Sequence, residues 1–213
     1  MSSIQIFVEG VTDQKFLQDV IAEWYGVALS IGSIGKSSEI ISVDGKGAFD
    51  SPEKMKKLIP VFQQLAIQGI PTVVIFDADT FSTNQANLNL HSQKLNFTYF
   101  LFPDNQRDGE IETLLEEIIC PDNQVIFNCW KAFEDCLSGH KTSSTPSGSF
   151  TTPANKTKIY AYIETLVGET DSEKEKIKDR NPDYHNKLHW NLDPKHTSLK
   201  PLKEFLDPFF STQ

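Results

Sequence analysis

Short apolar runs alternate with amphipathic stretches through the first 120 residues. Compact runs rich in β-branched and aromatic side chains predict buried strands at residues 4–8, 40–43, 72–76 and 97–102. The stretches between them place apolar residues three and four positions apart, which is typical of helices. Strands and helices in alternation predict an α/β fold, with a mostly parallel sheet sandwiched by helices.

Some of these helices carry recognisable start signals. Thr12 or Asp13 is placed to cap the first helix, and Pro52 occupies the first position of the second. We expect the second helix to reach about residue 68, with Pro60 as the point where it would kink. Two further helices are predicted, over residues 84–95 and 111–119.

The chain changes character after residue 120. Gln124–Phe127 predicts a brief strand, and the apolar spacing that follows predicts a helix that ends at Gly139. Residues 138–155 are rich in Ser, Thr and Pro and predict a long flexible loop. Two more helices are predicted, over residues 156–167 and after Ser198. We therefore expect two parts, an α/β core over residues 1–120 and a mainly helical extension packed on it over residues 121–213.

The composition predicts a globular chain without a membrane span. Hydrophobic residues make up 38% of the 213 residues, which is more than a wholly disordered chain contains. No apolar run approaches the ~20 residues that cross a bilayer, and residues 1–5 lack the basic segment of a secretory signal. The three cysteines form no CxxC pair, which argues against a disulfide framework or a zinc ribbon. We expect a cytoplasmic protein with no membrane partner.

Negative charge is concentrated in the predicted core. The formal net charge is −9, and residues 1–120 hold 16 of the 29 acidic residues but only 8 of the 20 basic ones. An acidic surface repels the phosphate backbone of nucleic acids. One interpretation of this excess of negative charge is an ordinary acidic soluble protein. The other is that some of the acidic side chains face one another and require cations.

Three acidic pairs lie at or just beyond predicted strand ends. Because ligand sites of parallel sheets form at the carboxyl ends of the strands, we expect the pairs to converge there. Crowded carboxylates repel one another, and Mg²⁺, which prefers carboxylate oxygens and keeps waters that substrate phosphates replace, resolves that repulsion. Two such ions would support in-line phosphoryl chemistry. The predicted ligands of Mg²⁺, or of Mn²⁺ in its place, are Glu9, Asp13, Asp77, Asp79, Glu110 and Glu112.

These acidic residues also have a structural interpretation. Acidic residues at strand ends cap helices and form turns, which suits Asp13 better than Glu9 because Glu is a poor turn former. The interpretation is weaker for Asp77 and Asp79, which follow a fully apolar strand. The glycine-rich segment Asp44–Gly47 also follows a predicted strand. Its sequence predicts a tight turn, with a phosphate-binding loop as the alternative.

The same residues resemble a known family. Phe7-Val-Glu-Gly-x-Thr-Asp13 is similar to the Glu-Gly signature of the TOPRIM domain, and Phe76-Asp-Ala-Asp79 is similar to its Asp-x-Asp motif. TOPRIM domains occur in topoisomerases, primases and the overcoming-lysogenization-defect nucleases. The segments 102–116 and 198–209 more specifically resemble a family of small stand-alone TOPRIM-like proteins of unknown function. Together the motifs extend over nearly the whole chain, and the resemblance implies that the α/β core over residues 1–120 is TOPRIM-like.

The resemblance implies roles for individual residues. Glu9 matches the TOPRIM glutamate, which acts as a general acid/base or a metal ligand, and Asp77 and Asp79 match the metal-binding pair. Asp13 matches a further carboxylate that binds metal in the overcoming-lysogenization-defect nucleases.

The resemblance to those nucleases also implies a third acidic motif and a lysine that acts in catalysis. Glu110 and Glu112 match the acidic motif that follows the next strand. Lys156 or Lys158 matches the lysine that neutralises the phosphate in the transition state, and the alternative for both is a solvated helix start.

Two functions follow from the resemblance. The first is a metal-dependent nuclease, or a related phosphodiester-cleaving enzyme, that acts on DNA or RNA. The second is a non-catalytic TOPRIM-like module that binds metal or nucleotide in a phage-defence or mobile-element setting. The chain has no GxxxxGK[ST] segment and no tyrosine in a recognisable winged-helix context, so nucleotide-driven activity and strand passage are not expected. The sequence leaves the oligomeric state open, with a homodimer as one option.

Overall fold

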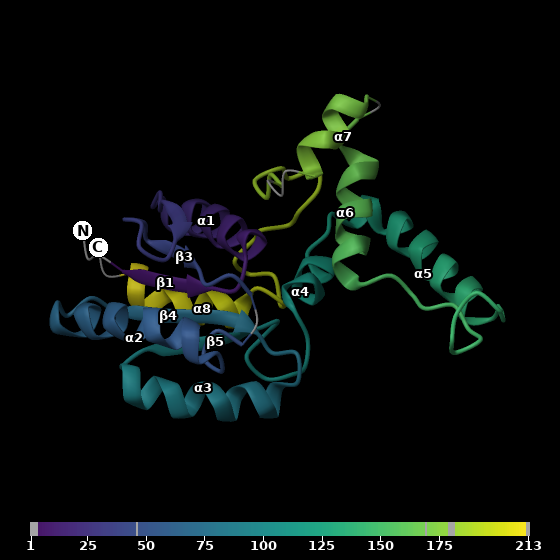
Figure 1. Cartoon of the computed structure of the whole chain (residues 1–213). Coiled ribbons are helices and arrows are strands. Elements are labelled where there is room, and N and C mark those ends of the chain that lie inside the picture. Colours follow the sequence, from purple (N-terminus) through teal and green to yellow (C-terminus); the bar gives the residue numbers. More distant parts are fainter. Residues whose placement is uncertain (1–3, 46, 169, 179–181, 212–213) are drawn as a thin grey trace.

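A five-stranded, fully parallel β-sheet forms the centre of the molecule (Figure 1). The computed structural model describes residues 4–45, 47–168, 170–178 and 182–211, with the backbone alone for residues 175–178. The strands lie in the order β2-β3-β1-β4-β5. Their bounds are β1 (Gln5–Val8), β2 (Ile31–Ser33), β3 (Ile40–Ser42), β4 (Thr72–Asp77) and β5 (Thr98–Phe102). The expected α/β fold is confirmed, and the four predicted strands correspond to β1, β3, β4 and β5.

Helices cover both faces of this sheet (Figure 1). Apolar side chains from α2 and α3 form one core with one face, and those from α1, α4, α6 and α8 form a second core with the other. The helix bounds are α1 (Val11–Tyr25), α2 (Pro52–Ile67), α3 (Phe81–Leu95), α4 (Ile111–Glu117), η1 (Pro121–Asn123, a 3₁₀ turn), α5 (Gln124–Ser138), α6 (Asn155–Leu166), α7 (Asp171–Lys178) and α8 (Lys200–Phe210).

Strand β1 shows why the central strands contain continuous apolar runs. Ile6 and Val8 belong to the core on the α1 side, whereas Phe7 between them belongs to the core on the α2 side. The Phe7 ring stacks on Phe62 of α2 with 4.6 Å between ring centroids. Because neither face of β1 meets solvent, the strand has a continuous apolar run instead of an alternating pattern.

Two features of the strands differ from the sequence prediction. Gln124–Phe127 was expected to be a strand, and this is wrong, because it forms the first turn of α5. Phe127 packs on Tyr162 of α6 with 5.2 Å between ring centroids, so the helix is anchored by a contact distant in sequence. The edge strand β2 was not predicted, because it contains a single apolar residue, Ile31, which is 41% exposed.

The helix starts depend on both local and distant contacts. Helix α2 begins at Pro52 and continues through Pro60, and its preceding residue Ser51 accepts a hydrogen bond from the Lys54 amide (3.4 Å). Helix α3 begins at Phe81, three positions before the predicted start. The Asp108 carboxylate accepts a hydrogen bond from the Phe81 amide (2.7 Å), and this cap from another segment explains the earlier start.

The second part of the chain contributes to the core on the α1 side. Helices α5, α6 and α7 extend away from the sheet, whereas α8 packs against it (Figure 1). Tyr184 and Trp190, which lie in the chain between α7 and α8, are almost completely buried. Leu202 and Leu206 of α8 are fully buried as well. The division at residue 120 and the flexibility of residues 138–155 stay predictions. Among the described helices, none is long and apolar enough to cross a bilayer.

Candidate active site

The candidate site lies where the direction of chain winding reverses. From β1 the chain adds β2 and β3 on one side, and it then crosses over to add β4 and β5 on the other. Strands β1 and β4 are therefore neighbours whose following connections run in opposite directions. Such a switch point leaves a crevice beyond the strand ends, where parallel α/β sheets bind their ligands. Glu9 directly follows β1, and Asp77 is the last residue of β4.

A cavity of about 360 Å³ at this edge collects most of the predicted site residues. Five of the six predicted metal ligands line it, together with one of the two candidate lysines. Ser42, Asp44 and Gly45, from the end of β3 and the turn that follows, complete one wall. The predicted residues in the lining are Glu9, Asp13, Asp77, Glu110, Glu112 and Lys156.

Backbone amides orient three of these carboxylates. Glu9 accepts a hydrogen bond from the Asp77 amide (3.2 Å), so the first two motifs are in direct contact. Asp13 accepts one from the Gly10 amide (2.7 Å), and Asp77 accepts one from the Ile111 amide at the start of α4 (2.8 Å). The convergence of residues 9, 77 and 111 is therefore built into the backbone.

A short β-bridge connects the second and third acidic motifs. The Asp79 amide donates to the Gly109 carbonyl (2.8 Å), and the Gly109 amide donates to the Asp79 carbonyl (3.2 Å). Asp79 has a φ of 46°, a left-handed conformation that is uncommon outside glycine. Asp79 does not line the cavity described above. It lines a neighbouring cavity of about 210 Å³ instead. Glu9 and Asp77 line both cavities.

The carboxylates are withdrawn from water and repel one another. Glu9, Asp13 and Glu112 are 8%, 6% and 6% exposed, respectively. Desolvation, followed by repulsion from Glu9 and Glu112, raises the pKa of Asp13 to about 7 against the pull of the Gly10 amide and Lys156. Desolvation and repulsion from Asp13 and Glu9 raise the pKa of Asp77 to about 9. Buried carboxylates with raised pKa values require a proton or a cation to be neutralised.

The side chains do not form a finished metal cluster. Within the described part of the chain, no group of three or more Asp, Glu, His and Cys side chains is arranged to hold a metal ion as it stands. The predicted role of the six carboxylates as metal ligands therefore stays a prediction.

The two candidate lysines have different surroundings. Lys156 lines the larger cavity and lies close enough to Asp13 to lower its pKa. Lys158 forms an ion pair with Glu116 instead, and its ammonium group lies 5.8 Å from the centre of the Phe127 ring. Of the two lysines, the structure brings Lys156 to the carboxylates.

Two residues of this region were not among the predicted site residues. Asn84 of α3 donates hydrogen bonds to the carbonyls of Asp77 (3.2 Å) and Ala78 (2.8 Å), and it holds the turn that carries the Asp-x-Asp motif. The Tyr184 hydroxyl is buried without a hydrogen-bond partner among the described atoms. Burial raises the pKa of Tyr184, and the charges of Asp13 and Glu112 raise it further. Neither residue belongs to a motif, so only its position in the fold reveals it.

The segment Asp44–Gly47 takes part in both cavities. The Gly45 amide donates to the Glu9 carbonyl (2.8 Å), which fixes the turn against the end of β1. Asp44 and Gly45 line the larger cavity and Gly47 lines the smaller one, whereas Lys46 lies outside the described residues.

The comparisons with known proteins give a family without an assigned activity. No curated protein and no solved structure matches the chain. A family model described as "Protein of unknown function (DUF3226)" matches residues 3–211. That description names no chemistry, so the resemblance to TOPRIM domains stays a prediction. Because the match covers nearly all 213 residues, the chain belongs to the DUF3226 family.

Proposed function

We propose that this protein is a TOPRIM-like, Mg²⁺- or Mn²⁺-dependent phosphodiesterase that acts on nucleic acid. One observation carries the proposal, namely that residues from three separate acidic motifs and a lysine line a single cavity at the switch point of a parallel sheet. The resemblance of the Glu-Gly and Asp-x-Asp motifs to TOPRIM sequences agrees with this location. We therefore interpret the larger cavity as a binding site for divalent cations and a phosphate group.

The chemistry of the side chains fits a hard divalent cation. The donor atoms are carboxylate oxygens, which Mg²⁺ and Mn²⁺ prefer over Zn²⁺-type nitrogen and sulfur sites. Burial and repulsion from neighbouring carboxylates raise the pKa values of Asp13 and Asp77, and a bound cation would relieve that repulsion. Cation binding would replace the protons on these groups, and the carboxylates would turn toward the ion from their present positions. Asp13, Asp77, Glu110 and Glu112 would hold the first ion, and Glu9 and Asp79 would extend the site toward the smaller cavity.

Each part of the site then has a task. The cation, when bound, neutralises phosphate charge and lowers the pKa of a coordinated water. Glu9 lies at the centre of the site, and its carboxylate accepts the proton of the attacking water. Lys156 places a positive charge beside the departing oxyanion. Asn84 and Gly109 hold the Asp77–Asp79 turn in place.

The direct test is metal-dependent cleavage of nucleic acid. Purified protein is incubated with single-stranded DNA, duplex DNA and RNA in Mg²⁺, Mn²⁺ or EDTA. We expect cleavage that EDTA abolishes, and we expect Glu9→Gln and Asp77→Asn to reduce the rate by about 10²–10⁴-fold. The matched controls Glu53→Gln and Asp122→Asn change exposed carboxylates on α2 and η1, and their rates should equal the wild-type rate.

Two results would contradict the proposal in different ways. Activity that survives both Glu9→Gln and Asp77→Asn would come from a contaminating nuclease. Metal binding by calorimetry without cleavage of any of the three substrates would favour the alternative function, a metal- or nucleotide-binding module that does not cleave.

A further inference from the structure

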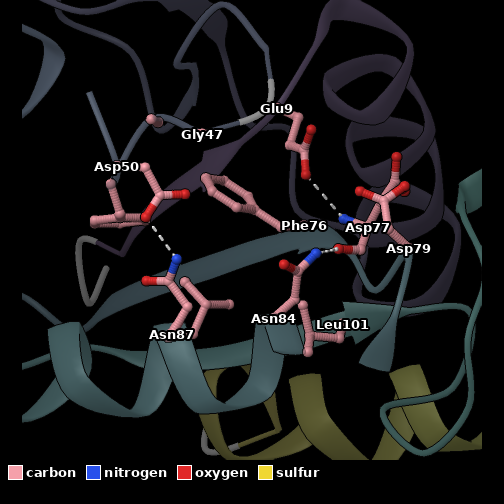
Figure 2. A pocket seen from close by; sticks show the side chains of 12 residues that line it. Glu9, Gly47, Asp50, Phe76, Asp77, Asp79, Asn84, Asn87 and Leu101 are labelled. Atoms are coloured by element: carbon pink, nitrogen blue, oxygen red, sulfur yellow. Dashed lines mark hydrogen bonds between the residues drawn. The ribbon is translucent and has the colours of Figure 1, made fainter. Parts of the chain in front are cut away.

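The smaller cavity has a composition unlike that of its neighbour. It holds about 210 Å³, and it meets the larger cavity along Glu9 and Asp77. Figure 2 shows Glu9, Asp77 and Asp79 at one end of this cavity, Asp50 and Asn87 at the other, and Phe76 between them. A molecule that extends from the carboxylates into the cavity therefore passes over an aromatic ring before it reaches a second polar group.

The middle of the cavity is aromatic and apolar. Phe49 and Phe76 both line it, with 5.7 Å between their ring centroids and 42° between their planes. They are 6% and 7% exposed, so packing in the α2-side core fixes their positions. Leu88 and Leu101 add aliphatic walls. The accessible part of this aromatic wall gives an apolar contact for a planar ring, and contact with aromatic side chains is favourable for every nucleobase.

The far end of the cavity presents a paired carboxylate and amide. The Asn87 side-chain nitrogen donates a hydrogen bond to the Asp50 carboxylate (2.7 Å). This bond fixes both side chains at the end of the cavity (Figure 2). A carboxylate accepts hydrogen bonds and donates none above its pKa, so the pair favours a ligand edge that carries N–H donors.

We infer that the smaller cavity binds one unpaired nucleobase next to the scissile phosphate, and that it prefers bases with an exocyclic amino group. The inference rests on the proposed function, because the phosphate of the same nucleotide would lie among the carboxylates. The volume lies below the ~300–1,000 Å³ that is typical of pockets for drug-sized ligands, which suits a single ring system. A base stacked within a duplex cannot enter such a recess, so the substrate presents an unpaired base.

Guanine has the edge that matches this end of the cavity best. Its N1–H and N2 amino groups are adjacent donors that one carboxylate can accept together, as Asp50 would. Thymine and uracil have no amino group, and a carbonyl on each side of their N3–H would face the carboxylate. The expected order is therefore guanine first and thymine or uracil last.

The test measures base preference separately from cleavage. Fluorescently labelled oligothymidylate, unchanged or carrying one deoxyguanosine, is titrated with the protein in Ca²⁺ in place of Mg²⁺, and the two dissociation constants are compared. We expect the oligonucleotide with guanine to bind about tenfold more tightly, which is the effect of one or two hydrogen bonds to a charged group. Asp50→Asn and Asn87→Ala should each reduce this ratio to about twofold or less.

A matched control is available on the same helix. Gln93 is an exposed polar residue of α3 outside both cavities, and Gln93→Ala should keep the wild-type ratio. Equal affinities of the wild-type protein for the two oligonucleotides would overturn the inference, as would a ratio that persists in both variants.

A diester without a base distinguishes this inference from the proposed function. If wild-type protein hydrolyses bis(p-nitrophenyl) phosphate but binds both oligonucleotides equally, the base pocket is wrong and the phosphodiesterase stands. If it shows the guanine preference but hydrolyses neither this diester nor nucleic acid, the base pocket stands and the phosphodiesterase is wrong.

Discussion

At the scale of single residues, Asp77 carries a strong electrostatic conflict in the site. Its pKa is raised to about 9 by desolvation and by Asp13 and Glu9, so folding without metal forces a proton onto a group that is ionised in the unfolded chain at neutral pH. The folded state therefore binds more protons than the unfolded state. Below pH 4 Asp77 makes its full contribution to the free energy of unfolding, and this contribution is lost as the pH rises toward 9.

Asp77→Asn should therefore stabilise the metal-free protein. The amide oxygen can still accept the Ile111 hydrogen bond, while the charge is removed. In EDTA at pH 8 we expect a higher Tm than for the wild type, by about 2–4 °C for each kcal/mol of relieved repulsion. The gain should shrink as the pH is lowered toward 4. Thermal unfolding followed by circular dichroism at several pH values measures this, and a Tm that falls by the same amount at pH 5 and pH 8 would contradict it.

The two lysines of α6 provide a second prediction. Lys156→Ala should lower kcat about 10²-fold with little change in Tm, because the residue is exposed and would act on the oxyanion. Lys158→Ala should leave kcat unchanged and lower the free energy of unfolding by about 1 kcal/mol, through loss of its ion pair with Glu116. Cleavage kinetics and urea unfolding of both variants separate these roles. The reverse pattern would assign the catalytic lysine to position 158.

At the scale of elements, the connection between β5 and α4 determines where the Asp-x-Asp motif lies. Gly109 bridges to Asp79, and it adopts a φ of 146°, which side chains other than glycine rarely adopt. A Cβ added there would lie 3.0 Å from Pro103 Cδ and 3.0 Å from Thr113 Oγ1. The backbone therefore needs glycine at this position both for its conformation and for its space.

Gly109→Ala should accordingly cost about 1–3 kcal/mol of stability and weaken Mg²⁺ binding, because the Asp77–Asp79 turn loses its support. Gly139→Ala is the control, since Gly139 ends α5 at an ordinary φ of −76°. Urea unfolding and titration calorimetry measure the two effects. Wild-type Mg²⁺ affinity in a folded Gly109→Ala protein would show that the bridge does not position the acidic motif.

The elements also show what a sequence can predict. The strands that carry Glu9 and Asp77 were predictable because a continuous apolar run bounded by polar residues is a strong local signal, and the parallel sheet then brings their ends together. The short β2 and the first turn of α5 were not predictable, because a single exposed isoleucine and a distant partner for Phe127 leave no local pattern.

The residues of the site also divide into those that the sequence predicts and those that it does not. Its carboxylates belong to motifs and were named from the sequence. Asn84, Asn87 and Tyr184 are isolated polar or aromatic residues whose importance comes from neighbours distant in the sequence, and the left-handed turn that places Asp79 in the smaller cavity leaves no local signal.

At the scale of the whole molecule, both parts of the chain contribute to the site. The carboxylates come from residues 9–112, whereas Lys156 and Tyr184 come from the predicted helical extension. Tyr184 packs against Phe16 of α1 with 5.3 Å between ring centroids, and Trp190 packs beside Tyr184 at 5.4 Å. Tyr184 therefore joins the extension to α1, within the electrostatic reach of Asp13 and Glu112.

Divalent cations should therefore stabilise the whole fold, and the effect should grow with pH. A ligand at 100 times its dissociation constant adds about 2.7 kcal/mol, which for a chain of this size corresponds to a rise in Tm of about 5–10 °C. Protons compete with the cation for Asp13 and Asp77, so the rise should be larger at pH 8 than at pH 6. Because a chain of net charge −9 also gains stability from simple screening, the control is NaCl at matched ionic strength. An equal rise in Tm with NaCl, or an undiminished rise with Mg²⁺ in Asp77→Asn, would show that the cations act on the surface charge and not in the cavity.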